Sequence, residues 1–131
     1  MEATFAALSE GATVEPSGRL SVLGVVSRLR FRDFPHLLPR IFFSCGIAIG
    51  TAERLQESVV EVELIDPDGR RMHTVVRDRR ILVGSSEDAN TLYFNAEIRN
   101  LSFPEPGDYQ FSIRVDGALL HAVGLAVERA A

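Results

Sequence analysis

The stretch Glu105-Pro106-Gly107-Asp108-Tyr109-Gln110-Phe111 decides the fold class of this chain. A Pro-Gly turn leads into a run in which apolar and polar residues alternate, which is typical of a half-buried strand. An acid, a glycine and a tyrosine at alternate positions before such a strand form the pattern of a tyrosine corner. In a tyrosine corner the ring closes one end of a β-sandwich, and the hydroxyl donates to backbone of the preceding turn. The pattern therefore predicts a sandwich in which Tyr109 is buried.

Alternating or β-branched stretches recur along the whole chain and are separated by turn sequences. They are Thr4–Leu8, Leu20–Phe31, Ile41–Ile49, Val60–Leu64, Arg71–Val83, Leu92–Arg99, Tyr109–Val115 and Leu119–Val127. Only Thr51–Glu57 has the composition of a helix, and it spans barely two turns. Because no long helix separates the strands, parallel βαβ units are excluded. We expect one antiparallel domain, residues 1–131, of seven or eight strands.

Four segments carry a resemblance to a known family: Ser17–Gly24, Phe34-Pro35, Val62–Gly69 and Phe103–Tyr109. They resemble a family of short bacterial proteins that is catalogued as a domain of unknown function and regarded as immunoglobulin-like. The resemblance extends from near Leu8 to near Val127 and implies an all-β, antiparallel immunoglobulin-like sandwich. Phe111 stands where antibody domains carry a cysteine, so no disulfide accompanies the corner. The resemblance implies no activity, because a fold does not determine function.

The turn Asp66-Pro67-Asp68-Gly69 predicts a hairpin with a three-residue loop. That loop sets the register of the hairpin: Asp66 opposite Arg70, Leu64 opposite Met72, Val62 opposite Thr74 and Val60 opposite Val76. Val60, Val62 and Leu64 then point into the core. Glu61 and Glu63 are expected in solvent, with Glu63 facing His73.

Composition excludes several kinds of chemistry. All 14 basic residues are arginines, so a P-loop lysine and a Schiff-base lysine are impossible. A single cysteine, Cys45, excludes a multi-cysteine metal site, and we expect it to be a small buried hydrophobe. The three histidines show no metal-ligand spacing; His36 is expected to be a solvated loop residue, and His121 indicates either a core histidine or a register shift. We predict no enzyme, no cofactor and no metal.

The charge pattern gives a candidate surface and excludes two classes of partner. A net charge of −4 and the lack of an aromatic platform argue against nucleic acid. The run Ile41–Gly50 is half the length of a membrane helix, and Met1–Phe5 lacks the basic start of a signal peptide, so a cytoplasmic protein without membrane contact is expected. Arg28, Arg30 and Arg32 alternate on one strand face. The candidate interaction surface is Arg28, Arg30, Arg32, Arg71, Arg77 and Arg79, unless these side chains form a solvated face balanced by acids.

Two functions remain open from the sequence. The first is a non-catalytic binding or assembly module that uses a sheet face or strand edge to bind a second copy or a protein partner. Leu20–Phe31 and Ile41–Ile49 favour it, because they hold more apolar surface than one small core absorbs. The alternative is a small ligand-binding protein or enzyme with an arginine-lined pocket at a loop end, for an acidic ligand.

Overall fold

The computed structural model describes residues 2–48, 57–82 and 91–131. Within these ranges the chain forms strands and no helix. The nine strands are β1 (Glu2–Val14), β2 (Leu20–Val26), β3 (Arg28–Phe31), β4 (His36–Ala48), β5 (Glu57–Ile65), β6 (Arg71–Leu82), β7 (Thr91–Phe103), β8 (Gly107–Val115) and β9 (Ala118–Arg129). Residues 51–56, which carried most of the possible helix, lie outside the described part.

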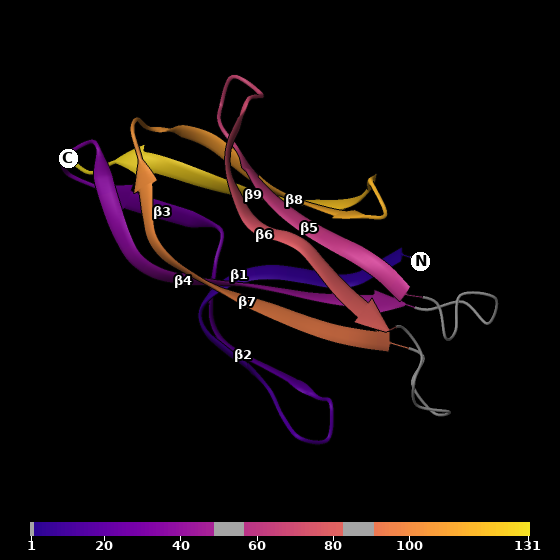
Figure 1. Cartoon of the computed structure of the whole chain (residues 1–131). Helices are drawn as coiled ribbons and strands as arrows, with labels where there is room; N and C mark the ends of the chain where they lie inside the picture. Colours follow the sequence, from indigo (N-terminus) through magenta and orange to yellow (C-terminus); the bar gives the residue numbers. More distant parts are fainter. Residues whose placement is uncertain (1, 49–56, 83–90) are drawn as a thin grey trace.

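The strands form two sheets that face each other (Figure 1). The first sheet has the order β2-β1-β4-β7, and the second has the order β3-β9-β8-β5-β6. The all-β prediction is confirmed. The described part holds nine strands where seven or eight were expected, and the pairing is not antiparallel throughout, because β3 runs parallel to β9.

The ninth strand arises because the apolar segment Leu20–Phe31 divides at Ser27. Its first part, β2, pairs with β1 in the first sheet, and its second part, β3, pairs with β9 in the second sheet. The chain crosses between sheets here without a hairpin turn, so β3 is free to run alongside the last strand. Periodicity identifies such a run as extended, but it carries no signal for the change of sheet.

The core lies between the two sheets and takes large apolar side chains from both. Phe43 of β4 stacks on Phe111 of β8 with ring centroids 6.2 Å apart, which joins the layers at their centre. Tyr109 is 1% exposed, its hydroxyl donates to the Glu105 carbonyl at 2.6 Å, and its ring meets Phe103 edge-on. The predicted burial of Tyr109 and its bond to the preceding turn are therefore confirmed.

The β5–β6 hairpin begins as predicted and then departs from the predicted register. The Asp66 amide donates to the Arg70 carbonyl, as the three-residue loop requires. Ile65 still pairs with Arg71, but at the next position Leu64 pairs with His73 instead of Met72. The pairs predicted from Leu64 outward are wrong, because bulges insert extra residues into β6 and shift the ladder repeatedly. Val60, Val62 and Leu64 nevertheless point into the core as expected, since β5 is held in place by β8 on its other side.

Candidate functional site

Three of the candidate arginines, Arg28, Arg30 and Arg71, come from strands at opposite edges of the second sheet. Arg28 and Arg30 belong to β3, whereas Arg71 belongs to β6. Arg28 and Arg30 do share one face, as predicted, since both guanidinium groups contact the Glu128 carboxylate, at 3.2 and 3.1 Å. Arg32 lies beyond the end of β3. The side chains of Arg77 and Arg79 lie outside the described part of the structure.

Glu63 is the clearest correction among the charged residues. It is 8% exposed, although the sequence placed it in solvent. Its carboxylate contacts Arg71 at 3.2 Å and Arg114 at 3.8 Å. These two arginines, from the strands on either side of β5, cover the carboxylate on the outer face of the second sheet. Arg71 therefore serves an internal ion pair, which leaves it less available to a partner.

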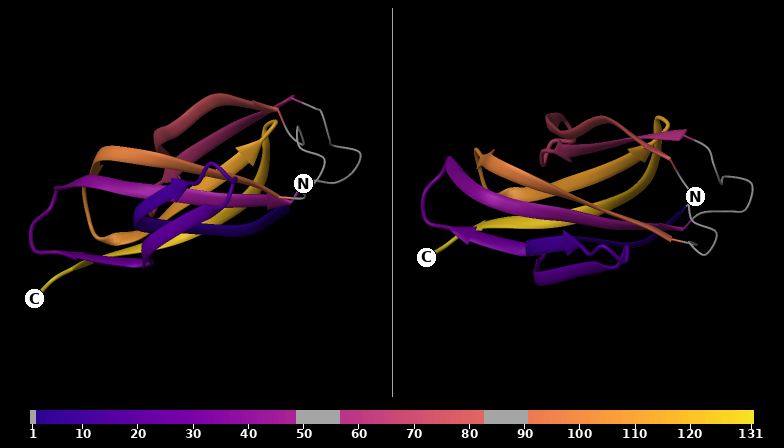
Figure 2. Two further views of the ribbon diagram at one scale, coloured as in Figure 1. Left: turned by 90° about the horizontal axis from the view of Figure 1, so that it is seen from below. Right: turned by 60° about the horizontal axis from the view of Figure 1, so that its bottom comes forward.

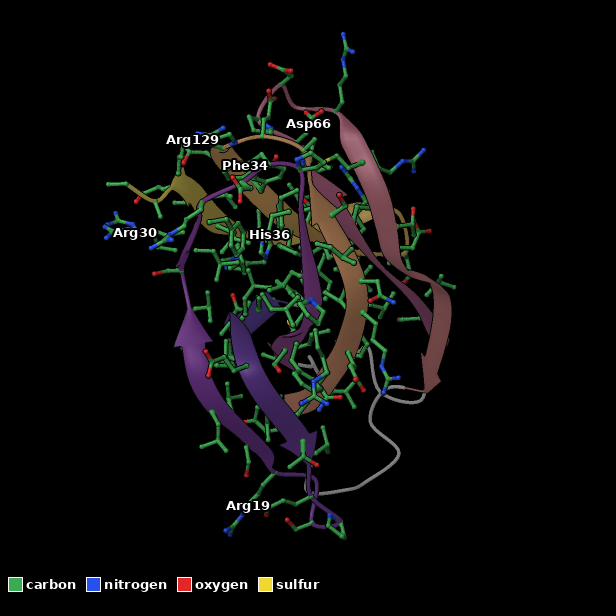
Figure 3. All side chains as sticks on the ribbon, turned by 90° about the vertical axis from the view of Figure 1, so that its left-hand side faces the viewer. Arg19, Arg30, Phe34, His36, Asp66 and Arg129 are labelled. Carbon is green, nitrogen blue, oxygen red and sulfur yellow. The ribbon has the colours of Figure 1, made fainter. Side chains whose placement is uncertain are left out.

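Of the three histidines, the structure describes the side chains of His36 and His121, which lie on different sheets, and the side chain of His73 lies outside the described part. His36 is half-buried and stacks on Phe31 with centroids 3.6 Å apart, so the prediction of a solvated loop residue is wrong. His121 is exposed beside a register shift of the β8–β9 ladder, which confirms the second of its two interpretations. Arg129 lies 4.9 Å over the ring of Phe34, near His36 and far from Arg19 (Figure 3). In the described ranges, no three His, Cys, Asp or Glu side chains gather as metal ligands.

Cys45 is a buried hydrophobic side chain, as predicted. Burial raises the pKa of its thiol from 9.0 to about 11, so the nucleophilic thiolate is scarce near neutral pH. Among the described residues there is no helix long and apolar enough to cross a membrane.

The most exposed apolar side chains lie on β2, which is an edge strand of the first sheet. Leu23 is 76% exposed and Val25 is 66% exposed. β2 hydrogen-bonds to β1 on one side, and its other side has no neighbouring strand within the described ranges. The apolar excess predicted for Leu20–Phe31 therefore reaches the surface here. In the described part of the second apolar segment, Ile41–Ala48, the side chains of Ile41, Phe43, Cys45 and Ile47 are buried in the core.

Strand β2 also differs from the other three sheet edges in charge. Its sequence, Leu20–Val26, contains no charged residue. The edge strand β3 carries Arg28 and Arg30, β7 carries Glu97 and Arg99, and β6 is rich in arginine from Arg71 onward. Charges on edge strands hinder pairing with other chains. Of the edges seen in the described ranges, β2 is the one without this protection.

A groove of about 450 Å³ lies on the outer side of the first sheet, and the sequence analysis did not predict it. It is lined by Phe5, Arg19, Leu20, Val22 and Tyr93. These residues come from β1, from the β1–β2 hairpin and from β7, and Figure 2 (right) shows the hairpin lying below the plane of β4 and β7. The one sequence signal is Gly46, a glycine within a strand, which often marks a close approach of another group.

Comparisons with known proteins bear on the fold and on family membership. No curated protein matches this sequence. A solved structure, Pseudomonas fluorescens alkylpurine DNA glycosylase AlkC bound to DNA containing an abasic site analog, is similar with a TM-score of 0.51 and 17% identity. The match covers 95% of this chain and 30% of that chain, so the likeness is one of fold to a part of a larger protein. A model described as a family of unknown function (DUF6941) matches residues 4–128, and the chain therefore belongs to that family.

Proposed function

We propose that this protein is a non-catalytic assembly module with an immunoglobulin-like fold, which pairs its edge strand β2 with β2 of a second copy. The observation that carries the proposal is the uncharged β2 edge, with Leu23 76% exposed and Val25 66% exposed. An edge strand offers unpaired backbone N–H and C=O groups, and apolar side chains beside them favour the addition of another strand.

The tyrosine corner supports the immunoglobulin-like part of the proposal. Tyr109 donates to Glu105 across the turn that enters β8, which is the bond expected of that corner. Two facing sheets whose aromatic side chains meet at the centre are a second supporting feature. Because a fold does not determine function, the proposal that this protein is an assembly module depends on β2.

The second copy is the partner that the geometry of β2 favours. Two identical antiparallel strands centred on Gly24 place Leu23 of each copy opposite Val25 of the other, on one face. This arrangement is twofold and self-complementary, as in most homodimers. Glu10 lies over Gly24 on the opposite face, with Oε2 3.0 Å from the position of a Cβ at Gly24. Its carboxylate therefore stays clear of the face on which the four apolar side chains would meet.

The alternative of an arginine-lined pocket receives less support from these residues. Arg28, Arg30 and Arg71 are each held by a carboxylate of the chain itself. They lie at opposite edges of the second sheet. An anion would have to displace Glu128 or Glu63 to reach them, which lowers the net gain of such a contact.

Sedimentation equilibrium at low micromolar concentration tests the proposal. We expect a dimer for the unchanged protein and a monomer for Leu23→Lys, because the substitution would place an ammonium group in the apolar contact. Leu119→Lys is the matched control: Leu119 is 53% exposed but lies at the start of β9, away from β2, so its dimer should persist. An unchanged protein that sediments as a monomer, or a Leu23→Lys dimer as tight as the control, would contradict the proposal.

A further inference from the structure

The groove beneath the β1–β2 hairpin is a separate feature from the exposed edge. Leu20 and Val22, which line it, alternate along β2 with Leu23 and Val25, which face away from it. We propose that this groove binds a small amphipathic carboxylate, with Arg19 contacting the acid group and the apolar walls covering the hydrocarbon part. This site does not depend on the pairing of β2 with a second copy.

The floor of the groove is built by the register of three strands. Phe5 of β1 pairs with Gly46 of β4, and Gly46 pairs with Tyr93 of β7, so the two aromatic side chains flank the glycine on one face. A Cβ at Gly46 would lie 3.0 Å from Cε1 of Tyr93 and 2.9 Å from Oγ1 of Thr4. The Tyr93 ring therefore rests against the backbone of β4. Because Gly46 has no side chain, the Tyr93 ring can lie over it and form part of the groove floor.

The opposite wall is apolar and belongs to the hairpin. Leu20 and Val22 face Phe5 and Tyr93 across the groove. Two aliphatic and two aromatic side chains around about 450 Å³ are typical of a site for a small ligand with an apolar body. Binding to such walls becomes more favourable with each methylene group of the ligand that is removed from water.

Charge decides which end group the ligand carries. Arg19 is the charged residue of the groove, and it has no carboxylate partner among the described residues. The nearest acid along the hairpin, Glu15, accepts a hydrogen bond from Ser21 at 3.1 Å. The Tyr93 hydroxyl is likewise without a partner in the described part of the chain. An unpaired guanidinium beside a free hydroxyl favours an anion with oxygen acceptors, and a carboxylate accepts two parallel bonds from arginine.

The test uses decanoate, below the concentration at which it forms micelles, as the probe. Titration followed by isothermal calorimetry and by NMR shifts is expected to show saturable one-to-one binding, with shifts at Phe5, Leu20, Val22 and Tyr93. Decan-1-ol, which has the same chain without the charge, is expected to bind more weakly.

Three variants separate the charge from the apolar walls. Arg19→Gln should weaken decanoate binding about fivefold, as expected for a partly solvated charge-assisted contact, and leave decan-1-ol binding unchanged. Gly46→Ala should weaken both ligands, because the new methyl group displaces the Tyr93 ring. Arg70→Gln is the matched control, since Arg70 belongs to the turn of Asp66, at the far end of the molecule from Arg19 (Figure 3). Circular dichroism verifies that each variant is folded.

Three results would overturn the proposal. The first is the absence of saturable decanoate binding to the unchanged protein. The second is equal binding of decanoate by Arg19→Gln and Arg70→Gln. The third is preference for a short peptide with a free carboxyl end, such as Ala-Ala-Leu-Leu, which would make the groove a peptide site instead. None of these results bears on the mass of the protein in solution, so failure here is distinct from failure of the β2 proposal.

Discussion

Replacing Tyr109 by phenylalanine tests the tyrosine corner, because the change removes one oxygen atom, that of the hydroxyl group. The Tyr109 hydroxyl donates to the Glu105 carbonyl at 2.6 Å, and the ring is 1% exposed. Phenylalanine keeps the ring and its edge contact with Phe103, whose centroid lies 5.0 Å away. The change therefore removes the hydrogen bond and little else. A hydrogen bond contributes about 0.5–1.5 kcal/mol net, and an acceptor left unpaired adds to the loss. Because Glu105 is exposed and water can reach its carbonyl, we expect a loss of about 1–1.5 kcal/mol.

Urea unfolding followed by circular dichroism measures this difference in the free energy of unfolding. Tyr93→Phe is the matched control, since the Tyr93 hydroxyl has no partner in the described part of the chain and lies at the surface. We expect that control to change stability by less than about 0.5 kcal/mol. A Tyr109→Phe protein as stable as Tyr93→Phe would refute the reasoning. It would mean that the hydroxyl contributes nothing to closing this end of the molecule.

Three further substitutions or measurements follow from local geometry. Glu63→Gln should destabilise the protein by about 1.5–3 kcal/mol in urea unfolding, because it removes the charge of a buried carboxylate that Arg71 and Arg114 contact. The control Glu61→Gln, on the same strand, should cost less than about 0.5 kcal/mol. Equal losses of stability in the two variants would contradict this account. Asp66→Ala should lower the free energy of unfolding by about 1 kcal/mol, since Asp66 Oδ1 accepts hydrogen bonds from the amides of Asp68 and Arg70 at 2.9 and 2.8 Å. A thermal melt unchanged from that of the parent would exclude that role. Burial raises the pKa of Cys45 to about 11, above the 9.0 of the unfolded chain, so the stability of the folded protein should fall as pH rises from 9 to 11. A thiol reagent at pH 8 should label only unfolded protein. Rapid labelling of the folded protein would show that the thiol is exposed.

Residue pattern predicted the parts of this fold that local chemistry determines. The corner at Tyr109, the turn at Asp66 and the inward face of Val60, Val62 and Leu64 each depend on turn residues or on alternation within a few positions. Alternation reports which face a side chain takes, because neighbouring residues in a strand point to opposite sides. It reports neither the number of strands nor the partner strand.

The features that the sequence missed depend on contacts between distant segments. A bulge at Met72 shifts the β5–β6 ladder by one residue, although the turn that precedes it is as expected. The burial of Glu63 requires arginines from β6 and β8 to cover its carboxylate. The residue pattern of β5 alone does not predict these contacts. The groove likewise requires Gly46, Phe5 and Tyr93 to meet across three strands. Composition could predict apolar excess near residue 20, but only the sheet order identifies β2 as the edge that exposes it.

Disulfide cross-linking of a Leu23→Cys, Val25→Cys double variant tests the central claim most directly. Directly opposite residues of an antiparallel pair have Cα atoms about 4.5–5.5 Å apart, which lies within the range that a disulfide spans. The buried Cys45 stays out of the reaction in the folded protein. If β2 pairs with itself around Gly24, mild oxidation at low micromolar concentration should convert most of the protein into a covalent dimer that a reducing agent separates. A double variant that stays monomeric on a non-reducing gel, or that cross-links no faster than a Leu119→Cys control, would contradict the account.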